Sequence, residues 1–287
     1  MNVNTKAEIL VSALPYIQHH RGKTVVVKYG GSAMINEELK VTVIQDIILM
    51  ACVGIRVVLV HGGGPEIDAL LKKTGKESRF IDGLRYTDEE TMELVQMVLC
   101  GKVNKGICSQ IQKAGSRAIG LSGIDGALLQ ARRLLSDGKD LGLVGEIEAV
   151  DTSLLNSVLD SGVIPVVSSV AYGLGEVECY SLNVNADAAA AKIAGALKAE
   201  KLILMTDVPG ILRDVNDPAS LIKSATRADL LKLKKDGVVS KGMIPKLDCC
   251  VIALEEGVKN ATVIDGRLPH ALLIELFTVD GVGTMIE

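Results

Sequence analysis

The sequence predicts an α/β protein: a three-layer α-β-α sandwich around a mostly parallel central sheet, with a small antiparallel flap. Two observations predict this fold class. Short apolar runs rich in β-branched residues alternate with segments of helical length, which is typical of parallel strands joined by helices. In addition, 48% of the 287 residues are hydrophobic and only 2% are aromatic, so the predicted core is aliphatic.

The predicted elements follow in chain order. The apolar runs predict buried strands at 25–28, 55–60, 118–121, 163–168, 202–206 and 261–264, and the longer segments predict helices at 37–53, 89–113, 187–197 and 246–256. Segment 128–150 breaks the alternation, because 128–133 and 145–150 have the pattern of hairpin strands around the polar turn 136–140. These two strands are the predicted flap.

A further helix is predicted before the first strand, over residues 7–18. Leu10, Leu14 and Ile17 recur there at helical spacing, which gives the helix one apolar face. That face either docks on the body of its own chain or contacts another subunit. We therefore expect an N-terminal helical segment, 1–22, and a compact unit of two lobes, 23–180 and 181–287.

Composition and charge argue against several classes of function. The net charge of −4 and the scarcity of aromatic residues disfavour binding to nucleic acid or to anionic membranes. No stretch has the roughly 18 uninterrupted apolar residues that span a bilayer, and no secretory signal pattern is present. The six cysteines form no C-x-x-C pair, so neither a metal site nor a redox motif is predicted. We expect a soluble protein of a reducing compartment.

Two of the predicted strands end in glycine turns. Lys28 is followed by Tyr-Gly-Gly, and strand 55–60 is followed by His61, three glycines and a proline. In an open α/β sheet, ligands bind in the crevice beyond the carboxyl ends of the strands, and glycines there bring backbone N–H groups close to an anion. The pattern predicts a phosphate-binding crevice. A capped strand followed by an ordinary turn is the alternative at Lys28.

Two glycine segments are similar to motifs of other protein classes, but the rest of the sequence supports neither class. The His-Gly-Gly-Gly of 61–64 also occurs in the oxyanion hole of α/β-hydrolases, but the sequence has no G-x-S-x-G nucleophile elbow. Gly22-Lys23-Thr24 is similar to the end of a P-loop, but Ile17 stands where its first glycine belongs and the segment precedes a strand. Neither a hydrolase nor a P-loop NTPase is predicted.

Five motifs follow one another along the chain: Lys-Tyr-Gly-Gly at 28–31, His-Gly-Gly-Gly-Pro at 61–65, Asp-Gly-Leu-Arg-Tyr-Thr-Asp at 82–88, Asn-Val-Asn-Ala-Asp at 183–187 and Gly-Met-Ile-Pro-Lys at 242–246. In this order they resemble the amino acid kinase superfamily and, within it, the N-acetylglutamate kinases. The resemblance covers nearly the whole chain. The third and fourth motifs separate this family from the related kinases of carbamate, aspartate, glutamate and uridylate.

The resemblance implies ATP-dependent phosphorylation, with Mg²⁺, of the γ-carboxylate of N-acetyl-L-glutamate to N-acetyl-L-glutamyl 5-phosphate, a step of arginine biosynthesis. By motif match, Lys28 and Lys246 flank the transferred phosphoryl group and Asp187 orients both lysines. This fits the chemistry, because a carboxylate acceptor is already ionised at neutral pH and the catalytic task is electrostatic. A related kinase of another small acid, or a non-catalytic arginine or nucleotide sensor of the same fold, is the alternative.

The resemblance also assigns the two lobes, with the acyl-amino acid in 23–180 and ATP in 181–287. For the acyl-amino acid it implies backbone contacts at Gly63 and Gly64, a grip on the α-carboxylate by Arg85, and a contact of Asn183 with the acetamido group. An Arg fork suits a carboxylate, although a solvated arginine and a helix-capping asparagine are the alternatives. For ATP the implied residues are Gly30, Gly31, Thr206, Asp207, Gly210, Ile211, Leu212, Val238 and Ser240.

Both ends of the chain resemble the arginine-inhibited, hexameric branch of this family, in which the N-terminal helix interlaces dimers. The resemblance implies that Tyr16, Glu275 and Gly281 contact L-arginine as a feedback inhibitor, in a homo-oligomer that is a dimer or a hexamer. Similarity of the N-terminal half to cyanobacterial and plastid forms implies control by a PII-type signalling protein, although Ile252 stands where those forms carry an arginine. The expected location is the cytoplasm, with a plastid stroma as the alternative.

Overall fold

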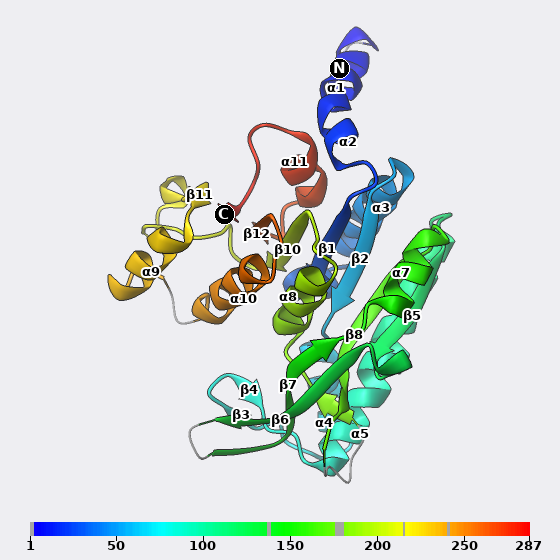
Figure 1. The fold of residues 1–287 in the computed structure, drawn as a ribbon, viewed down its shortest axis with the longest axis vertical. Coiled ribbons are helices and arrows are strands. Elements are labelled where there is room, and N and C mark those ends of the chain that lie inside the picture. Colours follow the sequence, from blue (N-terminus) through cyan, green and yellow to red (C-terminus); the bar gives the residue numbers. More distant parts are fainter. Residues whose placement is uncertain (1–2, 137–138, 176–180, 215, 240–241) are drawn as a thin grey trace.

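The computed structural model describes residues 3–136, 139–175, 181–214, 216–239 and 242–287. Within them, eleven strands form one continuous sheet with helices on both faces (Figure 1). The predicted α/β sandwich is therefore confirmed. The strands are β1 Thr24–Tyr29, β2 Arg56–His61, β5 Ala118–Gly123, β6 Leu129–Ser136, β7 Lys139–Val150, β8 Ile164–Gly173, β9 Ser181–Asn183, β10 Lys201–Thr206, β11 Ser224–Ala225, β12 Asn260–Asp265 and β13 Thr284–Ile286.

The helices lie between the strands along the chain. They are α1 Val3–Ser12, α2 Leu14–His20, α3 Glu37–Cys52, α4 Gly64–Lys73, α5 Glu89–Gln96, the π-helical segment η2 Met97–Val103, α6 Asn104–Lys113, α7 Ser153–Asp160, α8 Ala186–Ala196, α9 Arg227–Lys235, α10 Ile244–Glu255 and α11 Ala271–Phe277. Three short 3-10 turns complete the list: η1 Gly31–Met34, η3 Asp125–Ala127 and η4 Pro218–Ser220.

The strand order places the turns that follow three strands side by side. Across the sheet the order is β11-β13-β12-β10-β1-β2-β8-β6-β7-β9, and β5 pairs with β8. Strands β10, β1 and β2 run parallel, with Val26 of β1 beside Val58 of β2. The carboxyl ends of these strands, at Tyr29, His61 and Thr206, therefore meet at one edge of the sheet.

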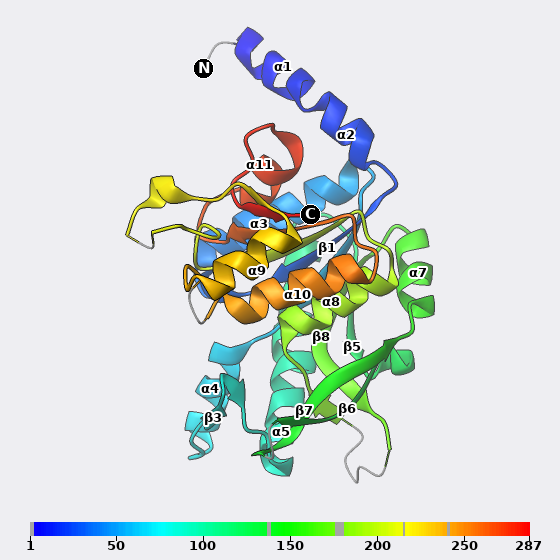
Figure 2. The ribbon, with the colours of Figure 1, turned by 60° about the vertical axis from the view of Figure 1, so that its left-hand side comes forward.

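Helices cover both faces of the central strands, which explains why these strands are continuous apolar runs. Helices α8 and α10 pack together on one face, while α3, α6 and α11 lie on the other (Figure 2). Because side chains alternate along a strand, Lys28 of β1 reaches Asp187 at the start of α8, whereas Tyr29 lines a hollow with Lys40 of α3 and Ile107 of α6. The side chains at the end of β1 thus lie on opposite faces of the sheet, in two separate hollows.

Two predicted elements differ from the structure in their details. The helix predicted over 89–113 is divided, because the π-helical segment η2 separates α5 from α6. The helix predicted over 7–18 is two helices, since α1 ends at Ser12 and Pro15 lies in the first turn of α2. Proline has no backbone N–H to continue the hydrogen bonds of a preceding helix, so a break at this position is expected.

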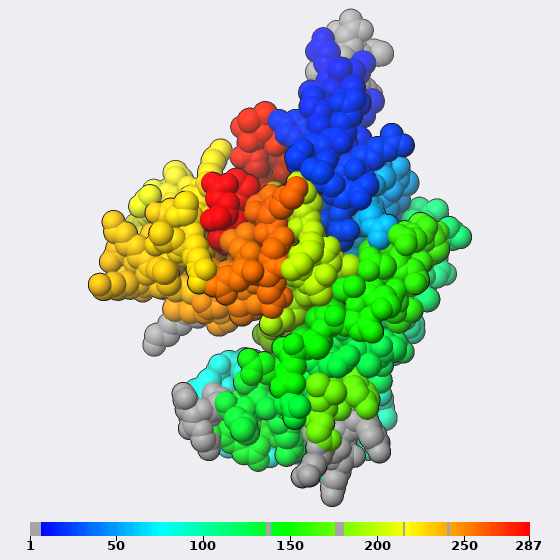
Figure 3. Space-filling view, viewed as in Figure 1, coloured from blue at the N-terminus to red at the C-terminus, as the bar shows by residue number. Residues whose placement is uncertain are grey.

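The predicted flap consists of antiparallel strands, as expected, with Arg132 of β6 opposite Glu146 of β7. These strands continue the large sheet through the β6–β8 pairing and do not form a unit of their own. A separate two-stranded antiparallel sheet, β3 Phe80–Ile81 with β4 Leu84–Arg85, was not predicted. Figure 3 shows the surface hollowed between the part built by β6 and β7 and the part built by α9 and α10.

Candidate active site

A carboxylate and two lysines converge at the carboxyl end of β1. Asp187, in the first turn of α8, has Lys28 Nζ 3.0 Å from its Oδ1 and Lys246 Nζ 2.6 Å from its Oδ2. The three side chains come from three elements: β1, α8 and α10. The structure therefore brings together the three residues that the resemblance assigned to catalysis.

The environment of Asp187 keeps it ionised. Burial by itself raises the pKa of this carboxyl, but the positive charges of Lys28 and Lys246 outweigh burial and hold its pKa below the ordinary value. The side chain of Asn185 caps the same helix, accepting from the backbone N–H groups of Asp187 at 2.8 Å and Ala188 at 3.2 Å. The cap fixes the first turn of α8, so Asp187 is held at the end of the sheet.

The glycine turn after β1 is shaped by close approach. A Cβ at position 30 would lie 2.5 Å from Lys28 Nζ, so a larger residue would displace the ammonium group from its present position. Gly31 has a φ of +68°, and a Cβ there would lie 2.6 Å from Asp207 Oδ1, which accepts a hydrogen bond from the Ser32 N–H at 2.7 Å. Asp207 thus ties the end of β10 to the turn after β1.

A hollow lies over the two lysines and both glycine turns. Its lining includes Lys28, Lys246 and Asp187, together with Gly30, Gly31 and Gly62–Pro65. Backbone N–H groups in the first turn of α4, which begins at Gly64, have no acceptor within the helix. The hollow therefore combines two ammonium groups with a helix N-terminus, which is an arrangement suited to a phosphate.

A second hollow adjoins the first and contains Arg85 and Asn183. It shares Gly62–Gly64 with the first and is also lined by Phe80 and Leu99. Arg85 is mostly buried. Asn183 Nδ2 donates to the Thr87 hydroxyl at 3.1 Å, so its role in the structure is not helix capping.

The guanidinium of Arg85 is held by four contacts. Nη1 donates to Asp68 Oδ1 at 2.7 Å and to Ser78 Oγ at 2.6 Å, and the ring of Phe80 lies 4.8 Å from Cζ. Nη2 is 3.4 Å from the carbonyl of Gly64. The sequence analysis did not identify Asp68 and Ser78. An Asp four residues into the helix after the glycine turn is a common surface pattern, and only the fold brings it to Arg85.

The predicted ATP-binding residues lie in two places. Four of them, Gly210, Ile211, Leu212 and Val238, line one small apolar hollow with Val208, Val239 and Met243. Thr206 lies at the end of β10 and Asp207 follows it, beside the turn of Gly31. Ser240 lies outside the described residues.

The residues predicted to bind arginine lie where α2 approaches α11. Glu275 is buried, with Lys201 Nζ 2.7 Å from its Oε1 and the Val282 N–H 3.1 Å from its Oε2. A Cβ at Gly281, whose φ is +55°, would lie 3.1 Å from the same Oε2. Tyr16 of α2 is half-buried. The sequence analysis missed Lys201, because the first residue of a buried strand gives no signal of an ion pair.

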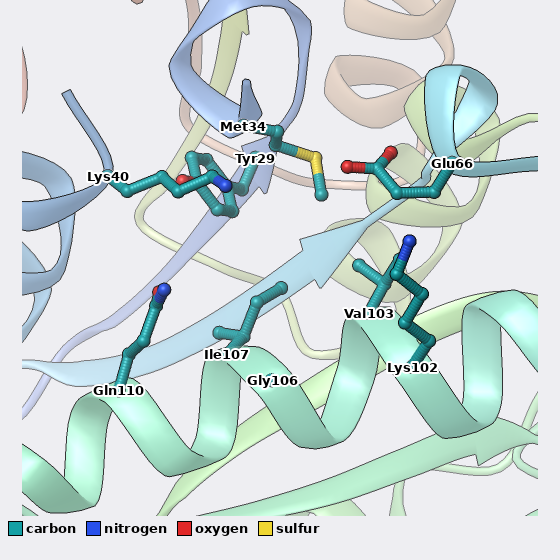
Figure 4. A pocket seen from close by; sticks show the side chains of 9 residues that line it. All are labelled: Tyr29, Met34, Lys40, Glu66, Lys102, Val103, Gly106, Ile107 and Gln110. Carbon is teal, nitrogen blue, oxygen red and sulfur yellow. The ribbon is translucent and has the colours of Figure 1, made fainter. Parts of the chain in front are cut away.

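A further hollow lies behind the glycine turns, on the α3 and α6 side of the sheet (Figure 4). Glu66 of α4 and Lys102 of η2 extend into it from facing helices, opposite Lys40 of α3. Met34 lines both this hollow and the one over the lysines, so the two spaces are separated by the turn that follows β1.

Comparison with known proteins decides the family. The family model described as "Amino acid kinase family" matches residues 23–265. The chain belongs to the amino acid kinase family. Within the family it groups with the acetylglutamate kinases: that of Clostridium kluyveri is 57% identical over 286 residues, covering 100% of both chains, and that of Moorella thermoacetica is 52% identical over 289 residues, covering 98% and 97%.

Solved structures agree with this family fold. An N-acetylglutamate synthase from Neisseria gonorrhoeae, complexed with coenzyme A and N-acetyl-glutamate, is 29% identical with a TM-score of 0.85. The match covers 98% of this chain and 63% of that one, so this chain spans less than two thirds of the synthase. A carbamate kinase from Giardia, 17% identical with a TM-score of 0.66, shares the fold and covers 92% and 98%.

Two features are absent from the described residues. No helix among them is long and apolar enough to cross a bilayer. Nor do the described side chains include a group of three or more His, Cys, Asp or Glu residues placed to hold a metal ion.

Proposed function

We propose that this chain transfers the γ-phosphate of ATP to the side-chain carboxylate of N-acetyl-L-glutamate, giving N-acetyl-L-glutamyl 5-phosphate, a step of arginine biosynthesis. The observation that carries the proposal is the bridge of Asp187 between Lys28 and Lys246, at the junction of two adjoining hollows. The 57% identity to an acetylglutamate kinase over the whole chain supports the choice of substrate.

The two lysines supply the electrostatic part of catalysis. A carboxylate and a triphosphate repel each other, and the negative charge on the transferred phosphoryl group must be balanced in the transition state. Lys28 and Lys246 stand on either side of Asp187, which keeps both ammonium groups in the hollow before substrate arrives. Preorganised charges of this kind cost no reorganisation at the moment of transfer.

The acyl-amino acid occupies the hollow that contains Arg85 and Asn183. Arg85 Nη2 and the backbone of the glycine turn are within reach of one ligand there, since all of them line the same space. The α-carboxylate pairs with Arg85 and the acetamido group meets Asn183, which leaves the γ-carboxylate directed to the lysines. The N–H groups of Gly63 and Gly64 donate to oxygens at the reacting centre.

ATP lies with its phosphates over Gly30 and Gly31 and its base in the apolar hollow of Gly210, Ile211, Leu212 and Val238. Thr206, Asp207 and Ser240 complete the nucleotide site. Asp187 is already paired with two lysines. Mg²⁺ that enters with ATP would neutralise part of the charge on its phosphates.

The test is ATP consumption with Mg²⁺ and one acceptor at a time: N-acetyl-L-glutamate, L-glutamate, L-aspartate or carbamate. We expect turnover with N-acetyl-L-glutamate alone and its collapse in Lys28→Ala and in Lys246→Ala. Lys192→Ala is the matched control, because Lys192 lies on α8 with Asp187 but pairs with Glu256, away from the hollow. Turnover with another acceptor would reject the substrate, and no turnover with any acceptor would favour the non-catalytic sensor.

Regulation by L-arginine is a second part of the proposal. Gly281 lies beside Glu275 of α11, and α2, the helix that contains Tyr16, contacts α11. Glu275 offers a carboxylate that pairs with Lys201. L-arginine added to the assay should inhibit turnover, and Glu275→Gln should weaken the inhibition. Unchanged inhibition in Glu275→Gln would move the arginine site elsewhere.

The assembly and location complete the proposal. The chain forms a homo-oligomer, a dimer or a hexamer, in the cytoplasm, and a PII-type protein is a candidate partner. Binding of a PII protein to the purified chain, followed by gel filtration, tests the last point. If the PII protein does not co-elute with the chain, it is rejected as a partner.

A further inference from the structure

His61, at the end of β2, is the residue that joins the sheet to the glycine turn. Its side chain has no exposed surface. Nδ1 lies 2.8 Å from the carbonyl oxygen of Gly62, and Nε2 lies 3.0 Å from Nδ2 of Asn104, the first residue of α6. An imidazole between a carbonyl and an amide has to adopt one particular protonation state, and the neighbours of Asn104 decide which.

The amide of Asn104 has only one orientation that satisfies its surroundings. Nδ2 lies 2.9 Å from the carbonyl oxygen of Val166 and 3.2 Å from that of Leu121, both of which can only accept. On the other side, Oδ1 accepts a hydrogen bond from Lys105 Nζ at 3.1 Å. A rotated amide would place its oxygen against two carbonyl oxygens, so the nitrogen must face His61.

The proton on His61 is therefore on Nδ1. The carbonyl of Gly62 can only accept, so Nδ1 carries the proton and donates to it. Nε2 keeps a lone pair, and it shares the two N–H groups of the Asn104 amide with the carbonyls of Val166 and Leu121. Burial lowers the pKa of His61 to about 4, which keeps the ring neutral at pH 7. Histidine thus acts here as a fixed donor and not as an acid or a base.

The direction of the Gly62 carbonyl sets the direction of the next N–H. In a planar trans peptide the C=O and the N–H point in opposite directions. When the carbonyl of Gly62 is drawn to the His61 ring, the N–H of Gly63 points away from that ring. Gly62, Gly63 and Gly64 line both hollows.

The π-helical segment η2 packs directly against the same turn. A Cβ at Gly63 would lie 2.8 Å from Leu99 Cδ2 and 3.2 Å from Val103 Cγ2, so the backbone of the turn rests directly on η2. Asn104 follows η2 immediately. π-Helical turns shift the residues that follow them around the helix axis and occur often near functional sites.

We propose that Asn104 is a positioning residue: through His61 it fixes the peptide between Gly62 and Gly63, so that the Gly63 N–H is aimed at the phosphoryl group and its acceptor. The inference rests on the proposed function for what the N–H meets. The tautomer of His61 follows from the hydrogen bonds alone. Asn104 itself contacts no substrate.

The first test measures the tautomer and does not depend on any substrate. Protein labelled with ¹⁵N-histidine has four histidines, and the His61 signals are those lost in His61→Gln. Ring ¹H–¹⁵N correlation spectra at pH 7 should show a proton on Nδ1 and a bare Nε2. A proton on Nε2 of His61 in the wild-type protein would overturn the assignment, whatever the activity of the variants.

The second test measures kinetics in Asn104→Leu, which has a similar volume and no donor. We expect kcat to fall at least tenfold, while KM for ATP changes less than threefold, because the base of ATP is bound at the distant hollow of Leu212 and Val238. Asn156→Leu, on the half-buried side of α7, is the matched control and should keep wild-type kcat. If Asn104 were important for folding alone, Asn104→Leu would lower the amount of folded protein, and the folded fraction would keep its kcat and its KM for ATP.

A folded Asn104→Leu protein with wild-type kcat overturns the proposal. If Asn104→Leu does not fold, Asn104→Ser replaces it. Serine keeps a hydroxyl for the neighbouring carbonyls but is too short to reach His61. The proposal again requires a lower kcat with a nearly unchanged KM for ATP. Absence of turnover in the wild-type protein would reject the proposed function, while the tautomer measurement would still decide the assignment of His61.

Discussion

Gly30 and Gly31 are the residues at which one added methyl group would disturb the site most directly. At Gly30 the methyl would meet Lys28 Nζ, and at Gly31 it would meet Asp207 in a backbone conformation that favours glycine. Neither residue bears a functional group. They matter because they leave the volume next to β1 to the charged side chains of Lys28 and Asp207.

Asp187→Asn should lower kcat by at least 100-fold, which corresponds to about 2.7 kcal/mol of transition-state stabilisation. The amide keeps the shape of the carboxylate but removes the negative charge that holds Lys28 and Lys246 together. Steady-state kinetics with MgATP and N-acetyl-L-glutamate measures the effect. Asp151→Asn, at an exposed turn, is the control. Equal activity in the two variants would show that the charge of Asp187 is dispensable.

The stability of the protein should fall between pH 7.5 and pH 4.5, in part through His61. Its pKa is lowered from 6.5 to about 4 by burial, so between these values the unfolded chain binds a proton that the folded chain does not. Stability from this group is complete above pH 6.5 and is lost as the pH falls, by roughly 2–3 kcal/mol at pH 4.5.

Urea unfolding at several pH values measures that slope. In His61→Gln the same titration should be shallower by the contribution of one group, whatever the stability of the variant at pH 7.5. Parallel slopes for the two proteins would contradict the lowered pKa. His20, whose pKa burial also lowers to about 4, is present in both proteins and so does not affect the comparison.

Among the elements, η2 packs directly against the turn that precedes α4. Gly64 and Pro65 begin α4 in the order expected of a helix N-terminus, and the turn before them lies on Leu99 and Val103. The glycine turn therefore owes its position to a helix that follows it in the chain by more than 30 residues. A change in the packing of η2 should therefore shift the backbone of the glycine turn.

Gly63→Ala and Gly106→Ala are a matched pair that tests this contact. Gly63→Ala places a Cβ against Leu99 and Val103, and we expect a loss of about 1–3 kcal/mol in stability together with lower kcat. Gly106 lies in α6 with open space around the added Cβ, and Gly106→Ala should raise stability by about 0.5–1 kcal/mol through helix propensity. Thermal or urea unfolding distinguishes the two, and equal effects would contradict the contact.

In the whole molecule, α1 and α2 extend away from the body at the end opposite the flap (Figure 1, Figure 2). Three apolar side chains of α1 are largely uncovered: Leu10 is 74% exposed, Val11 67% and Ile9 51%. Leaving three aliphatic side chains in water forgoes the free energy of burying them, about 25 cal/mol for each Å². This arrangement favours the proposal that the N-terminal helices contact another subunit.

Deletion of residues 1–12 should therefore reduce the size of the assembly and leave the fold and basal turnover in place. The deleted part contains α1, while α2 and its contact with α11 remain. Light scattering coupled to gel filtration measures the mass of both forms. An unchanged mass would show that α1 is not an assembly contact, and Leu10→Ser with Val11→Ser tests the same face without shortening the chain.

For most ends of the central strands, the position predicted from the sequence differs from the observed one by no more than one or two residues. The reason is that β1, β2 and β10 are continuous apolar runs that end in polar turns. Sequence reasoning identified Lys28, Lys246 and Asp187 through motif resemblance, not through spacing. It could not predict the contacts of Arg85 with Asp68 and Ser78 or the pairing of Glu275 with Lys201. Those contacts join residues on different elements, and local pattern has no information about them.

The sequence by itself determined the fold class, the glycine turns and the family, since each depends on residue type and order along the chain. Only the tertiary structure decided that two lysines 218 positions apart share one carboxylate, that the predicted long helix contains a π-helical segment, and that Asn104 faces His61. The physical reason is that parallel strands bring distant turns to one edge of a sheet. Side-chain geometry at that edge depends on packing from both layers of helices.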